Sequence, residues 1–234
     1  MSDEATPEPA VPAATVVLLR DTPDGVETLM LRRDTELEFA GGAWVFPGGR
    51  IDPEDYPEGT AGDDRGAVFE AARNAAAREA MEEAGLVVDP GGLVWFAHWT
   101  PPHGAGARRR FATWFFAARA PGGMVVVDDG EIRDHLWIRP TDALRRRDAG
   151  EILIIPPTWV TLHTLASGDS VDHLLSRMDA AEPEVYVTRM GRVDGIGVSM
   201  WAGDAGYEDG NADQPGPRHR LVMDNTGWRL ERDV

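Results

Sequence analysis

The stretch Arg78-Glu79-Ala80-Met81-Glu82-Glu83-Ala84-Gly85-Leu86 decides how the rest of this 234-residue chain is interpreted. It closes a segment, 66–84, that is rich in the strong helix formers Ala, Glu, Arg and Met. Gly85 follows that segment and supplies a residue that favours the end of a helix. The sequence therefore predicts a helix over 66–84. On this helix Glu79, Glu82 and Glu83 are spaced i, i+3 and i+4, so their carboxylates share one face.

Three carboxylates on one helix face repel one another unless a cation neutralises them. Hard divalent cations such as Mg²⁺ and Mn²⁺ prefer oxygen ligands, and carboxylates are among their usual partners in proteins. The alternative is a solvated acidic face, which is what most runs of charge in an acidic protein are. The spacing alone leaves the metal site and the solvated face open.

The nine residues resemble the Nudix signature, in which an Arg-Glu pair precedes a Glu-Glu pair and a Gly at fixed spacing. Glu70, with seven residues between it and Arg78, also falls where that signature has a Glu. The position of the signature's opening Gly is occupied here by Asp64. We therefore place the opening at Phe46-Pro47-Gly48-Gly49, with residues 50–69 replacing the short loop of the family.

The resemblance implies a single α/β/α Nudix sandwich with a mixed sheet, and a hydrolase that uses Mg²⁺ or Mn²⁺ to cleave a diphosphate linkage. Activated water would attack phosphorus, and catalysis would consist mainly of charge neutralisation and positioning. By the same resemblance the site residues have distinct roles. The metal ligands are Glu79, Glu82, Glu83 and the carbonyl of Gly49; the general base is Glu79 or Glu131; Glu70, Arg78 and Gly85 support the metal-bearing helix.

Three further segments favour a subgroup of the family that includes peroxisomal-type coenzyme A diphosphatases. One is the segment 29–34, ending in Arg33-Asp34 and leading to the Pro-Gly-Gly turn; the others are the tracts 100–113 and 150–158. Glu38 stands where the coenzyme A pattern has an Arg, which weakens that inference. Arg33 and Arg110 are the candidate substrate-binding residues, since Arg binds phosphate in a bidentate manner.

Other substrates remain open, namely ADP-ribose, NADH, a dinucleotide or a nucleotide sugar, because the signature marks the diphosphate chemistry and not its flanking groups. A protein of another class, a non-catalytic Nudix module that binds a nucleotide-like ligand, is the rival interpretation. Three mutually repelling carboxylates argue against that rival, since a binding module has no need to keep them.

The composition excludes several other kinds of site. All 23 basic side chains are Arg, so lysine-based phosphate loops and Schiff bases are excluded, and the absence of Cys excludes thiolate chemistry and disulfides. The formal charge of 23 − 40 = −17 opposes nucleic-acid binding. No secretory signal or membrane span is expected, so the sequence favours a cytoplasmic location. The oligomeric state is left open, with a homodimer among the alternatives.

The pattern of apolar runs and turn residues predicts three regions: a tail over 1–12, a Nudix domain over 13–180 and a β-rich C-terminal extension over 181–234 packed on the core. The predicted strands are 14–19, 26–32, 43–46, 93–99, 110–117, 124–127, 136–138 and 184–188, with the first two forming a hairpin. The predicted helices after the signature are 141–147, 159–166 and 171–178.

Overall fold

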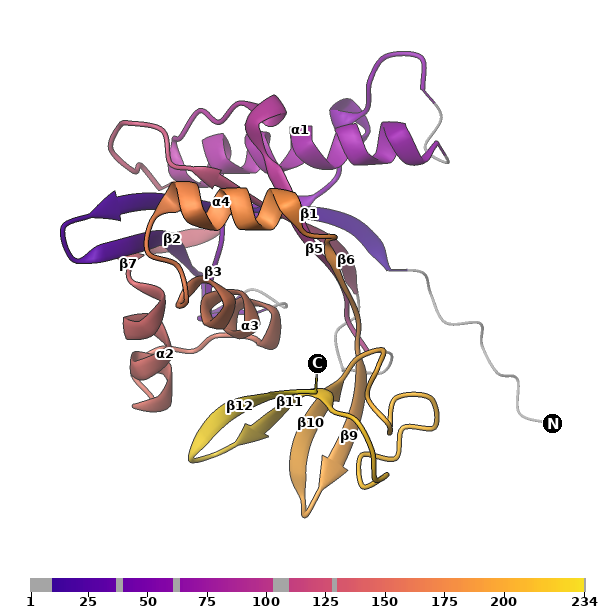
Figure 1. The fold of residues 1–234 in the computed structure, drawn as a ribbon. Helices are drawn as coiled ribbons and strands as arrows, with labels where there is room; N and C mark the ends of the chain where they lie inside the picture. The colour runs from indigo at the N-terminus through magenta and orange to yellow at the C-terminus, as the bar shows by residue number, and fades with distance from the viewer. Residues whose placement is uncertain (1–9, 37–39, 61–63, 103–109, 128–129, 234) are drawn as a thin grey trace.

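A computed structural model of the protein describes residues 10–36, 40–60, 64–102, 110–127 and 130–233 (Figure 1). Within these ranges the chain forms one eight-stranded sheet, one four-stranded sheet and four α-helices. The strands of the large sheet are β1 (Val11–Thr22), β2 (Gly25–Arg33), β3 (Trp44–Val45), β4 (Gly48–Arg50), β5 (Val94–Thr100), β6 (Phe111–Arg119), β7 (Ile132–Ile138) and β8 (Glu184–Val187). The helices are α1 (Arg65–Ala84), α2 (Pro140–Asp148), α3 (Pro156–Leu165) and α4 (Val171–Ala180), with 3-10 turns η1 (Pro53–Asp55) and η2 (Pro90–Gly92).

The large sheet is mixed and runs in the order β3-β2-β1-β6-β5-β8, with β4 pairing to β1 and β7 to β2. Strands β1 and β2 form the predicted antiparallel hairpin. Strands β1 and β6 pair in parallel, as do β5 and β8, and the remaining pairs are antiparallel. Both edges of β1 are therefore occupied, which places this strand in the middle of the fold.

Helices cover the two faces of this sheet, as the sandwich prediction requires. Helix α1 packs on one face through six fully buried alanines, and these small side chains let the helix lie close to the strands. They are Ala71, Ala72, Ala75, Ala76, Ala80 and Ala84. The opposite face packs against α3 and α4 in a second apolar cluster that includes Trp159, Leu162 and Leu174.

Local signals fix the ends of α1 close to the predicted bounds. The Asp64 side chain accepts hydrogen bonds from the backbone N–H groups of Gly66 and Ala67, which caps the N-terminus. Gly85 ends the helix with φ 67°, a left-handed conformation that glycine adopts without steric cost.

A smaller antiparallel sheet follows the large one, as expected for a β-rich C-terminal extension (Figure 1). Its order is β12-β11-β10-β9, formed by β9 (Arg189–Val193), β10 (Ile196–Met200), β11 (His219–Asp224) and β12 (Gly227–Arg232). Trp201 and Leu221 from this region are fully buried in the same cluster as Trp99 of β5. The small sheet is thus joined to the main core by apolar contact.

Three details differ from the sequence predictions. Residues 124–127 form no strand; instead the Val126 N–H donates to the Ala84 carbonyl and so covers the end of α1. Strand β1 begins at Val11, inside the predicted tail, because that residue's N–H donates to the Arg110 carbonyl (2.7 Å) at the entrance of β6. Strand β8 lies in the predicted extension yet pairs with β5 of the large sheet. Residues 1–9 of the predicted tail lie outside the described residues.

No helix in the described ranges combines the length and the apolar character needed to cross a membrane.

Candidate active site

The signature helix lies directly against Gly48 and Gly49, which form the start of β4. The backbone N–H of Gly48 donates to Oε2 of Glu83 (2.9 Å). A side chain at Gly49 would overlap the Glu79 carboxylate, with its Cβ 2.6 Å from Glu79 Cδ. Glycine at position 49 therefore allows the Glu79 carboxylate to lie against the backbone of β4, while the Gly48 N–H binds the Glu83 carboxylate.

Arg78 is fixed by the segment inserted between the turn and the helix. Its Nε and Nη2 donate to the two carboxylate oxygens of Asp55 at 3.0 and 2.9 Å, a bidentate pair. Nη2 also donates to the carbonyl of Arg50 (3.0 Å). The Asp55 side chain is buried, so the guanidinium ties α1 to η1 and β4 in one fixed geometry.

The third nitrogen of Arg78 contacts two of the predicted metal ligands. Nη1 donates to Oε1 of Glu79 (2.7 Å) and to Oε2 of Glu82 (3.0 Å). Glu79 is largely buried, whereas more than half of the Glu82 side chain is exposed. Arg78 thus contacts two carboxylates of the signature, and its supporting role stays a prediction.

The supporting role predicted for Glu70 stays a prediction, because the described structure shows no contact that ties this residue to the site. Glu70 is exposed on the second turn of α1 and has no hydrogen bond or ion pair with any described residue. Glu70 lies eight positions before Arg78, a rise along the helix of about 12 Å at roughly 1.5 Å per residue. Asp55 occupies the position beside the guanidinium instead.

Sequence reasoning missed Asp55 because it lies in the inserted segment, which no family spacing covers. A local signal was present, since Asp52-Pro53-Glu54-Asp55 has a capping residue, a proline at the first helical position and an acid three residues after the cap. The structure shows this capping box, with the Asp52 N–H donating to Asp55 Oδ2 (2.8 Å).

Burial and mutual repulsion disfavour the charged forms of two signature carboxylates. Burial raises the pKa of Glu83 to about 8, with Glu79 and Glu131 adding repulsion, against the opposing hydrogen bond from Gly48 and the charge of Arg33. Burial also raises the pKa of Glu79, although Arg78 opposes this shift. A cation bound at this face would relieve both effects.

Arg33 and Glu131 lie at the margin of the same acidic face. Arg33 Nη2 forms an ion pair with Glu131 Oε2 (3.3 Å), and Arg33 Nε is buried without a hydrogen-bond partner. Glu131 directly precedes β7, and its charge acts on Glu79 and Glu83. The structure thus brings both residues, which are 98 positions apart, to the predicted site.

The remaining predicted residues are farther from this centre or act at the helix end. Arg110 lies at the entrance of β6, where its Nη1 donates to the Pro101 carbonyl (3.2 Å). Gly85 is the C-cap of α1, and its N–H donates to the carbonyls of Ala80 and Met81. Glu38 lies outside the described residues, as do 103–109 of the Arg-rich tract.

The donor chemistry of the face suits a hard divalent cation, because it consists of carboxylate and backbone oxygens. In the described part of the chain, no three acidic or histidine side chains already surround one point. The reason is visible in the contacts: Arg78 holds the Glu79 and Glu82 carboxylates, while Glu83 is held by Gly48. The residues fit the ion by chemistry, and Glu79, Glu82, Glu83 and Gly49 are those that would hold it.

Comparison with known proteins tests the family assignment. Residues 9–156 match the family described as the NUDIX domain, which is more than half of the chain. The chain belongs to the Nudix family. The Nudix fold is also found in a NUDIX hydrolase from Alicyclobacillus acidocaldarius, with a TM-score of 0.62 and 23% identity over 74% of this chain and 99% of that one.

Two looser similarities are to a MutT protein from Methanosarcina mazei Go1 and to the NUDIX domain of Shewanella oneidensis NrtR complexed with ADP ribose. The first has a TM-score of 0.49 and 16% identity over 70% of this chain and 100% of that one. The second has a TM-score of 0.45 and 17% identity over 59% and 78%. No curated protein matches the chain. As a member of the Nudix family, the protein is a hydrolase that acts on pyrophosphate bonds.

Proposed function

We propose that this Nudix hydrolase is a metal-dependent diphosphatase that cleaves a nucleoside-diphosphate-linked small molecule, with coenzyme A or an acyl-CoA as the leading substrate. The observation that carries the proposal is the acidic face of α1, where Glu79 and Glu83 lie against the Gly48-Gly49 backbone. Nudix enzymes generally use divalent metal ions, and we assign Mg²⁺ or Mn²⁺ to this face. When bound, such an ion neutralises diphosphate charge and makes a coordinated water more acidic.

The residues around the acidic face of α1 have separate roles in positioning the carboxylates and in accepting the proton of water. Arg78, held by Asp55, keeps Glu79 and Glu82 in position. Glu79 or Glu131 accepts the proton of the attacking water, and burial raises the pKa of Glu79, which makes its carboxylate a stronger base. The water oxygen forms a bond to phosphorus while the bridging P–O bond breaks, giving two phosphate-bearing products.

The preference for coenzyme A rests on the segment 29–34 and the two proline-containing tracts of the sequence. Arg33 lies near the end of that segment, where its Nη2 forms an ion pair with Glu131 and its Nε is buried without a partner, and its guanidinium is the group that would bind a phosphate oxygen. ADP-ribose, NADH and nucleotide sugars share the diphosphate group and are the alternative substrates.

The test is a panel of coenzyme A, ADP-ribose, NADH, a nucleotide sugar and nucleoside triphosphates, each with Mg²⁺ or Mn²⁺, with products separated and identified. We expect turnover of a diphosphate-linked compound, highest with coenzyme A, and loss of turnover in Glu82→Gln. Turnover of ADP-ribose or NADH in preference to coenzyme A would overturn the substrate assignment alone. Absence of turnover throughout the panel would overturn the diphosphatase proposal and favour a binding module.

A further inference from the structure

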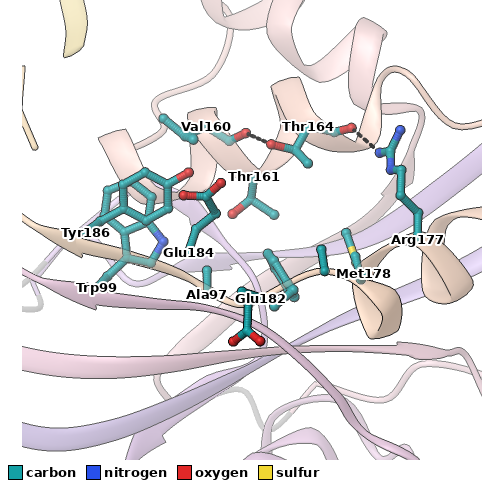
Figure 2. Close-up of a pocket in the computed structure, with 12 residues that line it drawn as sticks. Ala97, Trp99, Val160, Thr161, Thr164, Arg177, Met178, Glu182, Glu184 and Tyr186 are labelled. Carbon is teal, nitrogen blue, oxygen red and sulfur yellow. Dashed lines mark hydrogen bonds between the residues drawn. The ribbon is translucent and has the colours of Figure 1, made fainter. Parts of the chain in front are cut away.

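A cavity of about 230 Å³ lies between the large sheet and the helices α3 and α4 (Figure 2). Ala97 and Trp99 form its floor on β5, and both belong to the apolar cluster on the face opposite α1. The sheet therefore separates the cavity from the acidic face. Nine of its twelve lining residues follow residue 156, where the match to the NUDIX domain ends. The cavity is built mainly by the part of this chain that lies beyond the family match.

Three side chains that are at least nine-tenths buried bring unpartnered polar groups to this cavity. The Trp99 Nε1–H is buried without a hydrogen-bond partner. The hydroxyls of Thr161 and Tyr186 also have no hydrogen-bond partner among the described residues. A buried polar group without a partner costs free energy, so the Trp99 N–H is a signal for a ligand that accepts from it, and the two hydroxyls offer that ligand further hydrogen bonds.

The arrangement of these groups defines what the ligand must offer. Figure 2 shows Trp99, Tyr186 and the Glu184 carboxylate together, with Thr161 beside them on α3. The indole N–H only donates, so it requires an acceptor atom. Burial, with the added charge of Glu184, raises the pKa of Tyr186 to about 12, so its hydroxyl stays protonated. Oε1 of Glu184 already accepts from Arg232 Nη2 (2.7 Å), so Oε2 of Glu184 and the Glu182 carboxylate are the acceptors that suit an amino group or another donor.

Size and charge narrow the ligand class further. The cavity is smaller than the roughly 300–1,000 Å³ typical of sites for drug-sized ligands, which suits a single small heterocycle. Its lining carries two carboxylates and one guanidinium, that of Arg177, so it disfavours a phosphate group. Its walls include Phe96, Trp99 and Met178, which suit a flat apolar body.

We propose that this cavity is a second ligand site that binds an amino-bearing nucleobase, with ring nitrogens accepting from Trp99 and Thr161 and the exocyclic amine donating to Glu184. The sugar would lie towards the exposed rim at Glu182 and Arg177. The site does not depend on the proposed diphosphatase activity, since the sheet lies between the two.

The experiment measures nucleoside binding to the full chain by calorimetry and saturation-transfer NMR, with chelator present so that divalent ions are absent. Adenosine is paired with inosine and cytidine with uridine, because each second member lacks the amino group. We expect millimolar or tighter binding of adenosine or cytidine and at least fivefold weaker binding of its partner. Equal binding within both pairs, or no binding of adenosine and cytidine at millimolar concentration, would overturn the proposal.

Variants then locate the binding. Trp99→Phe and Thr161→Val each remove one polar group and are expected to weaken binding about five- to tenfold. Trp159→Phe is the matched control, since its Nε1 is also buried without a partner but lies outside the cavity. Thr158→Val is the control on α3 for the second variant.

Circular dichroism identifies any variant that does not fold. If one of the two cavity variants fails to fold, the affinity of the other tests the site. Equal affinities of folded cavity variants and their controls would contradict the site. Loss of binding in Glu83→Gln would place the nucleoside at the acidic face and overturn the proposal, whereas unchanged binding there supports it.

Discussion

Two neighbouring glycines at the site are constrained by different atoms. A Cβ at Gly48 would lie 2.5 Å from the Ala14 carbonyl oxygen in the adjacent strand, which is backbone and cannot easily move. A Cβ at Gly49 would meet the carboxylate of Glu79, which is the far end of a flexible side chain. The first glycine therefore allows β4 to pair closely with β1, and the second leaves room for the carboxylate of Glu79, a candidate catalytic group.

Gly49→Ala is expected to lower kcat at least about tenfold with little change in Tm, because the Glu79 carboxylate must move away from the backbone. Steady-state kinetics and thermal denaturation measure the two effects. Gly122→Ala is the control, since a Cβ there meets no atom within 4 Å. Full activity of Gly49→Ala would show that the position of Glu79 is not critical.

Glu83→Gln is expected to lower turnover about 100-fold or more yet raise Tm in metal-free protein at pH 8 to 9. The folded-state pKa of Glu83, about 8, lies above its ordinary value of 4.5. The carboxyl therefore favours the fold fully below pH 4.5, and that contribution is lost as the pH rises through 8. Thermal denaturation with chelator at pH 4 and pH 9 measures this, and the gain should appear only at the higher pH.

Adding Mg²⁺ should then raise the Tm of the wild-type protein more than that of Glu83→Gln, because a ligand that binds only the folded state stabilises it. Glu70→Gln is the matched control on the same helix, since Glu70 is exposed and without partners in the described structure. An equal Mg²⁺ response of wild type and Glu83→Gln would remove Glu83 from the metal site.

At the scale of elements, the inserted segment has a structural purpose in the site. Its short helix η1 presents Asp55 to Arg78, and Asn74 of α1 donates to the Asp55 carbonyl (2.8 Å). The insertion between β4 and α1 therefore packs against α1. It contributes the carboxylate that holds the central guanidinium of the signature.

Asp55→Asn is expected to reduce turnover about 10- to 100-fold, since it removes the charge and one acceptor of the bidentate pair that orients Arg78. The free energy of unfolding should fall by about 1–3 kcal/mol, because the side chain is buried. Glu54→Gln, the exposed neighbour in η1, should affect neither quantity. Chemical denaturation and steady-state kinetics of both variants measure the two effects. A greater loss of turnover in Glu70→Gln than in Asp55→Asn would contradict the role of Asp55 in orienting Arg78.

At the scale of the whole molecule, a buried ion pair organises the region between β10 and β11. Arg220 donates from Nε and Nη2 to the two oxygens of Asp204, at 2.6 and 2.5 Å, and both side chains are almost fully buried. Asp204 also accepts from the backbone N–H groups of Gly206 and His219. Its carboxylate thus joins the loop after β10 to the start of β11.

Asp204→Asn is expected to destabilise the protein by about 2 kcal/mol or more at neutral pH, because it leaves Arg220 buried without its charge partner. Burial alone would raise the pKa of Asp204, but the hydrogen bonds from Arg220 and the backbone outweigh this and lower it to about 2. The stabilisation is therefore present above the ordinary value of 3.8 and is lost as the pH falls towards 2.

Urea denaturation from pH 7 down to pH 2 measures this contribution, and the difference between wild type and Asp204→Asn should narrow in the acid range. Glu231→Gln is the control, because its ion pair with Arg229 is on the surface of the same sheet and should contribute less than about 1 kcal/mol. A constant difference across the pH range would show that Asp204 does not act through its charge.

The sequence by itself determined the features that depend on local spacing. Helix α1 was predicted within one residue, because Asp64, the alanine-rich run and Gly85 act within a few turns of one another. The β1–β2 hairpin followed from alternating turn and strand residues. The family and the hydrolase class followed from the spacing of Arg78, Glu79, Glu82 and Glu83. This spacing lies within one helix and can be read without knowing the surrounding structure.

Only the tertiary structure decided which distant residues serve these elements. The pairing of Asp55 with Arg78 depends on the path of an insertion whose length fixes no position in space. The same holds for β8, which crosses back to pair with β5, and for the cavity that its side chains help to form. Such contacts depend on long-range packing. The spacing of residues in the sequence determines only which side chains share one face of a single helix or strand.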